Sequence, residues 1–173
     1  MNSQLERAGR TAIKRKGPSA PLKKILQLGK MPLLSKKFSW VLDFGCGKGT
    51  DVSSLFQLGY SPSGWDPVHE PTMNGGYMYY GFYNYVLCTY VLNVIPKHKD
   101  RKAAVRKILR LLRPGGHAFI SVRRDVKKSG WTKNGTYQTN RASPEYDIPE
   151  HKFTCESIYK NTKFEIYELR KER

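Results

Sequence analysis

The chain alternates between short apolar runs and longer stretches in which apolar residues recur every three or four positions. The short runs indicate strands, and the longer spacing indicates helices with one buried face. Their alternation favours a mostly parallel sheet with helices on both faces. We predict helices at 21–28, 51–58, 99–112 and 151–160, strands at 40–42, 63–66, 77–80, 83–89, 117–122 and 163–169, and a hairpin around Asn134-Gly135.

A glycine turn follows the first predicted strand and precedes the helix at 51–58. The strand ends in Asp43, and glycine then stands at positions 45, 47 and 49. A backbone without side chains lets a ligand come close, and a helix N-terminus offers unpaired N–H groups to it. The spacing differs from the G-x-G-x-x-G of dinucleotide-binding folds. It resembles the first motif of class I S-adenosylmethionine-dependent methyltransferases.

This resemblance implies S-adenosylmethionine as cofactor and S-adenosylhomocysteine as product. The cofactor has no pyrophosphate, so the loop need only admit its amino-acid end, and Asp43 can meet the ammonium group. Asp66 ends a strand roughly 20 residues after the turn, where an acid accepts hydrogen bonds from the ribose hydroxyls. Ligands in such sheets lie beyond the carboxyl ends of the strands. The predicted cofactor contacts are therefore Asp43, Phe44, Gly45, Cys46, Gly47, Asp66, Pro67, Cys88, Thr89 and Tyr90.

A second part of the chain carries the same resemblance. A helix, the turn Leu112-Arg-Pro-Gly-Gly116 and a strand follow one another, as in class I methyltransferases. We therefore expect a Rossmann-like α/β fold with an antiparallel strand near the C-terminus. The chain is also similar to methyltransferases associated with DNA phosphorothioation systems. The segments that carry this likeness cover most of residues 10–140 and are Arg10–Pro21, Leu42–Val52, Gly64–Pro67, Tyr90–Ile95, Ser121–Arg123 and Gly135–Gln138.

The formal net charge of +17 is unevenly distributed. Residues 1–40 carry +9 and residues 97–128 carry +10, whereas residues 41–96 carry −3. Two basic blocks around a nearly neutral cofactor region favour a phosphate-bearing partner, which we take to be DNA or RNA. A generally basic surface without such a partner is the alternative. The predicted phosphate contacts are Lys14, Arg15, Lys16, Arg123, Arg124, Lys127 and Lys128.

The methyl acceptor stays open. Methylation of an exocyclic base amine normally uses an Asp/Asn/Ser-Pro-Pro-aromatic motif, but this chain has Cys88-Thr-Tyr-Val91 at that place. Carbon-5 methylation of cytosine needs a Cys nucleophile, and Cys88 lacks the usual Pro-Cys setting. His69 and His117 are candidate bases, and no catalytic residue is identified. Three alternatives remain: a methyltransferase of a small molecule or protein, a catalytically inactive cofactor-binding partner, and a pure nucleic-acid binder.

The length of 173 residues fits one domain. We expect residues 20–173 to form it, with the basic segment 1–19 either mobile or packed over the cofactor site. The three cysteines show no C-x-x-C pairing, which argues against a disulfide scaffold or a metal site and favours a reducing, cytoplasmic compartment. No apolar run reaches membrane-spanning length, so no membrane association is expected. The oligomeric state is not indicated.

Overall fold

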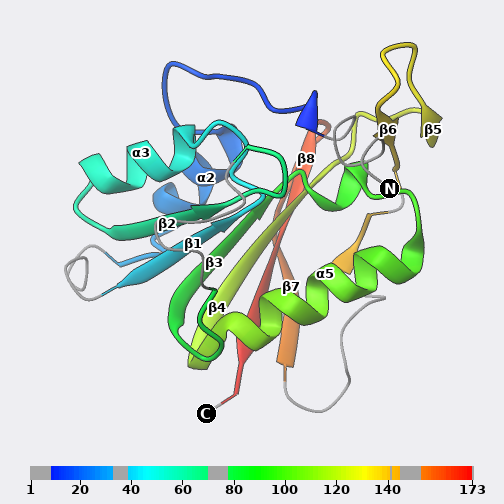
Figure 1. Cartoon of the computed structure of the whole chain (residues 1–173). Coiled ribbons are helices and arrows are strands. Elements are labelled where there is room, and N and C mark those ends of the chain that lie inside the picture. Colours follow the sequence, from blue (N-terminus) through cyan, green and yellow to red (C-terminus); the bar gives the residue numbers. More distant parts are fainter. Residues whose placement is uncertain (1–8, 33–38, 70–77, 141, 145–152, 173) are drawn as a thin grey trace.

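A six-stranded sheet forms the centre of the computed structural model, which describes residues 9–32, 39–69, 78–140, 142–144 and 153–172. The strand order is β2-β1-β3-β4-β8-β7, and β1 to β4 run parallel while β8 is antiparallel to both of its neighbours. Helices cover both faces, with α2 and α3 on one and α5 on the other (Figure 1). The strands are β1 (Trp40–Phe44), β2 (Ser61–Trp65), β3 (Tyr83–Thr89), β4 (Leu112–Arg123), β7 (Phe153–Lys160) and β8 (Phe164–Lys171). This order and these directions confirm the predicted Rossmann-like fold.

Local sequence signals fix the ends of α2 (Ala20–Gln27). The Ser19 side chain accepts a hydrogen bond from the Leu22 N–H at 3.2 Å and caps the N-terminus. Gly29 follows the last turn with φ = 66°, a backbone conformation that glycine adopts without strain. Leu22 and Ile25 are buried, whereas Leu28 is 40% exposed. Leu28 lies at the C-cap, past the last helical turn.

The core has two layers, one on each face of the sheet. α5 (His98–Leu111) buries Val105, Ile108 and Leu109 against one face. On the other face, Leu22 and Ile25 of α2 and Leu55 of α3 (Thr50–Gln57) are buried. β1 and β3 lie in the centre, and they read as near-continuous apolar runs because both of their faces are covered. No helix of the described chain is long and apolar enough to cross a membrane.

The structure corrects two predicted elements. Residues 153–160 form the edge strand β7, paired with β8, and not a helix; residues 151 and 152 lie outside the described ranges. Side chains at the start of this strand alternate between the core and solvent: Phe153 and Cys155 contact the core, while Thr154 and Glu156 are exposed. Residues 78–80 precede β3 without forming a strand, and residue 77 is not described. The predicted hairpin is confirmed as β5 (Gly130–Trp131) and β6 (Tyr137–Gln138).

Candidate functional site

The glycine turn lies at the carboxyl ends of β1 and β2. Gly45, Gly47 and Gly49 have φ angles of 84°, 53° and 71°, a region that other residues enter only at a cost. The N–H groups of Gly45 and Cys46 both donate to the Trp65 carbonyl oxygen, at 2.6 and 3.1 Å. These two bonds fasten the turn to the end of β2, so its shape is fixed by the neighbouring strand as well as by its glycines.

Close neighbours explain why two of these positions need glycine. A Cβ on Gly45 would collide with Val91 Cγ2, and a Cβ on Gly47 would stand 2.9 Å from the Ala12 Cβ. Ala12 belongs to the N-terminal segment, which therefore passes directly over the turn. The turn is held from one side by the residues after β3 and from the other by the segment before α2.

Asp43, at the centre of the site, is only 3% exposed. Burial raises the pKa of its carboxyl group well above the usual range and Asp51 raises it further, while Arg15 lowers it. No group among the described residues donates a hydrogen bond to this carboxylate. A buried acid without a donor favours the arrival of a cation or of N–H groups. The ammonium group at the amino-acid end of S-adenosylmethionine fits this requirement.

Asp66 follows β2 and faces the same turn. One carboxylate oxygen accepts the N–H of Gly47 at 3.1 Å, and the other accepts the N–H groups of Val68 and His69 at 2.9 and 3.0 Å. No described cation pairs with it. Since a carboxylate has about four acceptor positions, it retains acceptor capacity beside the turn. Its contact with the ribose stays a prediction.

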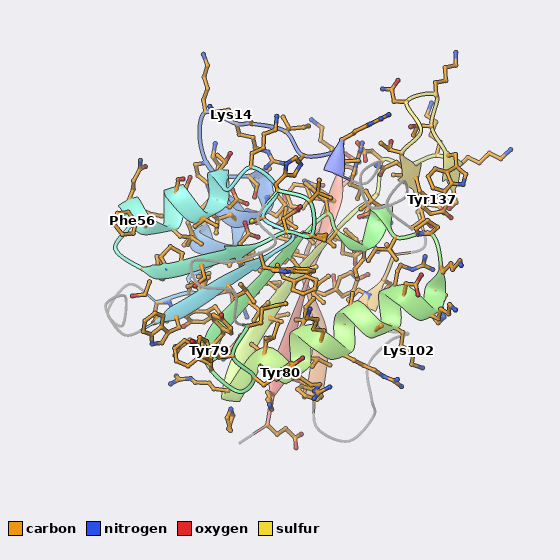
Figure 2. The ribbon with its side chains drawn as sticks, viewed as in Figure 1. Lys14, Phe56, Tyr79, Tyr80, Lys102 and Tyr137 are labelled. Carbon is orange, nitrogen blue, oxygen red and sulfur yellow. The ribbon has the colours of Figure 1, made fainter. Side chains whose placement is uncertain are left out.

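Residues of the basic N-terminal segment cover the site through backbone contacts. The Ser19 N–H donates to Asp51 at 2.7 Å, and the Arg15 N–H donates to the Thr50 hydroxyl at 3.4 Å. The side chains of Lys14, Arg15 and Lys16 are exposed, and Lys14 points away from the body of the molecule (Figure 2). The described backbone of this segment thus follows the protein, and its three cations are exposed, although Arg15 is close enough to the site to lower the pKa of Asp43.

The end of β3 supplies the opposite wall. Cys88 is fully buried in the α5-side core, and burial raises the pKa of its thiol, so it is neither a thiolate nucleophile nor exposed to a ligand. Thr89 ends the strand and is partly buried. Tyr90 has φ = 62°, a strained backbone for a bulky residue, and its N–H donates to the Ser121 carbonyl at 2.9 Å. Burial raises the pKa of Tyr90 to about 12, with Arg15 and Arg123 opposing the shift.

Asn93 is a residue of the site that the sequence did not single out. It lies in the short 3-10 helix η2 (Leu92–Val94) and is fully buried. Its side-chain oxygen accepts the Arg123 N–H at 2.8 Å, and its amide donates to the Thr139 carbonyl at 2.7 Å. One side chain therefore joins the residues after β3 to the end of β4 and to the β5–β6 hairpin. The signal in the sequence that could have pointed to Asn93 is a polar residue inside an otherwise apolar run.

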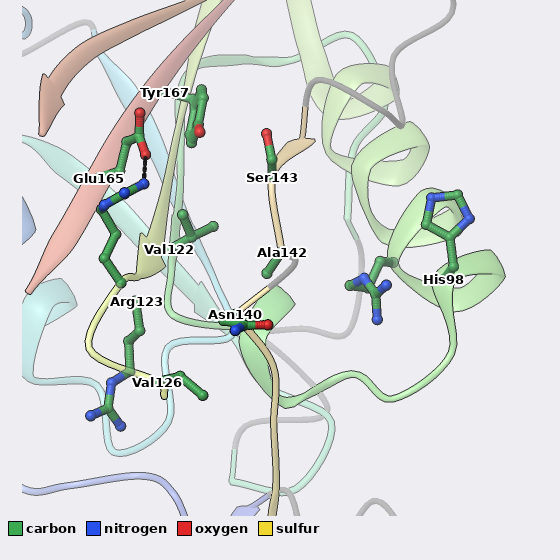
Figure 3. Close-up of a pocket in the computed structure, with 11 residues that line it drawn as sticks. His98, Val122, Arg123, Val126, Asn140, Ala142, Ser143, Glu165 and Tyr167 are labelled. Carbon is green, nitrogen blue, oxygen red and sulfur yellow. Dashed lines mark hydrogen bonds and ion pairs between the residues drawn. The ribbon is translucent and has the colours of Figure 1, made fainter. Parts of the chain in front are cut away.

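Two cavities open at the end of β4. The larger, of about 770 Å³, lies between the start of α5, the end of β4 and the start of β8; Figure 3 shows His98 on one side of it and Arg123 and Glu165 on the other. The smaller, of about 490 Å³, borders the hairpin. Arg101 and Asn140 line both. Neither cavity is lined by a residue of the glycine turn.

The basic residues predicted to hold phosphate differ in what they already bind. Arg123 makes a two-pronged ion pair with Asp125 at 2.8 and 2.9 Å, and Arg124 pairs with Glu165 at 2.5 Å. A phosphate would have to displace a carboxylate from either guanidinium. Lys127 and Lys128 line the smaller cavity, are exposed, and pair with no carboxylate of the described residues. Of the predicted phosphate contacts at the end of β4, Lys127 and Lys128 therefore remain unpaired with a described carboxylate. The sequence did not indicate that Arg123 and Arg124 are paired with carboxylates.

The histidines do not reach the site as bases. His117 lies in the middle of β4, roughly 20 Å by strand length from its carboxyl end, and its Nδ1 is 2.8 Å from Glu168. It belongs to a cluster in which Lys30 and Arg170 contact the same carboxylate. The Nε2 of His69 is 2.9 Å from the Gly9 carbonyl oxygen. Both rings are therefore engaged in structural contacts.

Comparison with known proteins agrees with this geometry. A family model described as "Methyltransferase domain" matches residues 13–156. None of the curated proteins compared with the sequence matches it. Among solved structures, the 1,6-didemethyltoxoflavin-N1-methyltransferase of Burkholderia thailandensis, with bound 1,6-didemethyltoxoflavin and S-adenosylhomocysteine, has a TM-score of 0.60 and 16% identity and covers 99% of this chain and 79% of its own.

Two further structures show the same fold. An S-adenosylmethionine-dependent methyltransferase of Bacteroides fragilis in complex with S-adenosylhomocysteine has a TM-score of 0.61 and 13% identity, covering 95% of this chain and 81% of its own. A structure described for the conversion of a disulfide bond into a thioacetal group during echinomycin biosynthesis has a TM-score of 0.65 and 16% identity, covering 90% and 83%. At these identities the likeness establishes the fold, and the family model covers most of the chain. The protein belongs to the methyltransferase domain family and is an S-adenosylmethionine-dependent methyltransferase.

Proposed function

We propose that the methyl acceptor is a nucleic acid, entering through the two cavities at the end of β4. The observation that carries the proposal is the charge of their lining. Among the described residues, Arg101, Lys127 and Lys128 line the smaller cavity without any carboxylate, and the one described carboxylate that lines the larger cavity, Glu165, is already paired with Arg124. A concave surface of one sign attracts a polyanion. The similarity to phosphorothioation-associated methyltransferases supports DNA as the first acceptor to test.

The residues of the chain would act mainly by positioning. Asp43 and the turn hold the amino-acid end of the cofactor, and Asp66 holds its ribose. When bound, the cofactor supplies a methyl group on a sulfonium, and transfer forms a bond from the acceptor atom to the methyl carbon as the sulfur–methyl bond breaks. Tyr90 stays protonated at neutral pH because burial raises its pKa to about 12, and it lies on the α2 and α3 side of the sheet, so it lines neither cavity. Orientation alone accounts for a large share of the rate in such displacements.

The direct test is the transfer of a tritiated methyl group from S-adenosylmethionine to DNA, RNA and protein in parallel reactions. We expect label in DNA or RNA, and each of the variants Lys127→Gln and Lys128→Gln should weaken nucleic-acid binding and lower its salt slope by about 1. Lys23→Gln, an exposed lysine on α2, is the matched control and should change neither. Label in protein alone, or binding that does not respond to salt, would refute the nucleic-acid assignment.

A small-molecule acceptor is the second candidate. The larger cavity, of about 770 Å³, is within the usual size of small-ligand sites, and its walls include the apolar Val122, Ala142 and Tyr167. One of the structural neighbours is a methyltransferase of a small heterocycle by its own description. Consumption of the cofactor in a fractionated metabolite extract, without label in any polymer, would favour this candidate.

A further inference from the structure

Four aromatic side chains form an exposed cluster at the amino-terminal edge of the sheet. Tyr79 and Tyr80 are 59% and 57% exposed, Trp40 is 45% exposed and Phe82 is 37% exposed. The ring centroids of Trp40 and Phe82 are 4.9 Å apart, and those of Tyr79 and Phe82 are 5.6 Å apart. Single exposed apolar residues need no explanation, but several in mutual contact mark a binding surface. We call these four residues the aromatic cluster.

The aromatic cluster lies away from the cofactor site. Trp40 begins β1, whose other end leads into the glycine turn, so the strand alone separates the two by about 13 Å. Figure 2 shows Tyr79 and Tyr80 at the end of the molecule opposite Lys14, which lies over the cofactor side. The methyl-transfer site therefore does not account for these rings.

A row of cations on α5 leads to the aromatic cluster. Lys99, Lys102, Arg106 and Arg110 follow one another at spacings of three or four residues, which places them along one face of the helix, and Arg113 follows just past the helix end, in β4. We call them the α5 cation row. None of the five pairs with a carboxylate among the described residues. Such a row has a high positive potential because nothing in the described chain neutralises it.

The rings and the cations are held in one rigid unit. The guanidinium of Arg110 lies 4.6 Å from the centroid of the Tyr80 ring. The N–H groups of Gly81 and Phe82 donate to the carbonyl oxygens of Arg110 and Leu111, at 2.9 and 3.0 Å. The turn that presents the rings is therefore hydrogen-bonded to the last turn of the helix that presents the cations. Preorganisation of this kind reduces the ordering cost of binding.

We propose that the aromatic cluster and the α5 cation row together bind single-stranded nucleic acid, with bases stacked on the rings and phosphates along the helix. Exposed rings beside a cationic track suit unpaired bases, which have accessible faces, and not a duplex, whose bases are stacked internally. The helix extends this track over about 20 Å toward the cavities near His98. The surface is separate from the methyl-transfer site, so the proposal goes beyond the proposed function and does not require nucleic acid to be methylated.

The test is fluorescence anisotropy with a fluorescein-labelled oligodeoxynucleotide of about 20 bases, single-stranded or in a duplex of the same sequence. The double variant Tyr79→Leu/Tyr80→Leu should weaken single-strand binding about tenfold or more and leave duplex binding nearly unchanged. Phe56→Leu removes an aromatic ring that is 73% exposed on α3, and as the matched control it should change neither affinity.

The α5 cation row is tested separately. Lys102→Gln/Arg106→Gln should lower the slope of log affinity against log salt concentration by about 1 to 2 between about 50 and 200 mM salt. Cofactor binding measured by calorimetry should be unchanged in every variant, which shows that the fold is intact.

Equal losses for Phe56→Leu and the tyrosine variant, or equal losses on single strand and duplex, would overturn the proposal. So would sedimentation showing a dimer that Tyr79→Leu/Tyr80→Leu dissociates without any change in single-strand affinity, because the cluster would then be an interface between copies of the chain. Failure to methylate nucleic acid while single-strand binding persists would refute the proposed function and leave this inference standing.

Discussion

Replacing Asn93 by alanine tests how one buried side chain holds the site together. The substitution removes the acceptor of the Arg123 N–H and the donor to the Thr139 carbonyl, and Asn93 is fully buried while Thr139 is 2% exposed. A buried polar group that loses its partner costs about 1–3 kcal/mol. Two such groups predict a loss of roughly 2–6 kcal/mol in the free energy of unfolding. For a chain of this length that is a fall in Tm of roughly 4–24 °C.

Urea unfolding and thermal unfolding measure this loss, and methyl transfer measured well below the new Tm reports on the site. We expect a higher KM for the acceptor, because the hairpin and the end of β4 lose their common anchor. Asn140→Ala is the matched control: its side chain accepts one exposed hydrogen bond from Ser129, so its effect should stay below about 1 kcal/mol. If Asn93→Ala were no more destabilising than Asn140→Ala, the anchoring role would be refuted.

Three further predictions concern the turn and the charges. Burial raises the pKa of Asp43, and a cation binds the ionised form of its carboxyl group, so cofactor affinity should fall as the pH drops through that raised pKa. Calorimetry on Asp43→Asn should show a roughly 10- to 100-fold loss of cofactor affinity and no such pH dependence. Gly47→Ala should cost about 1–2 kcal/mol of stability and weaken cofactor binding, while Gly17→Ala, where a Cβ meets nothing within 4 Å, should do neither. Burial raises the pKa of Glu168, but hydrogen bonds from His117, Arg170 and Lys30 outweigh this and hold it at about 2, below the usual 4.5. Stability should therefore be lost as the pH falls from about 4.5 to 2, and the loss should be smaller in Glu168→Gln, as acid titration followed by circular dichroism would show.

The elements that local chemistry encodes could be predicted from the sequence. The ends of α2 follow from Ser19 and Gly29, and the turn between β1 and α3 follows from glycines whose φ angles are positive in the structure. β1 and β3 were recognisable as short apolar runs, and α5 was predicted to within one residue at each end. Each of these signals lies within about ten residues of the element it specifies, so no knowledge of distant contacts was needed.

The elements that depend on distant partners could not be predicted in this way. β7 is a strand because it pairs with β8, and its own polar sequence does not distinguish an edge strand from a surface helix. Arg124 is neutralised by Glu165, 41 positions away, so a basic pair in the sequence is not a free anion site in the fold. The sequence also does not show that Tyr79 and Tyr80 are exposed, or that Arg110 of α5 lies over the Tyr80 ring, because both depend on how α5 packs.

By itself the sequence determined the cofactor turn, because the glycines that adopt positive φ angles and the acid at the strand end are close neighbours in the chain. Only the tertiary structure decided which charges remain available to a partner, because an ion pair forms between side chains that the sheet brings together from distant parts of the chain. It also decided that Asn93 links the end of β4 to the β5–β6 hairpin, because its partners Arg123 and Thr139 are 30 and 46 positions away.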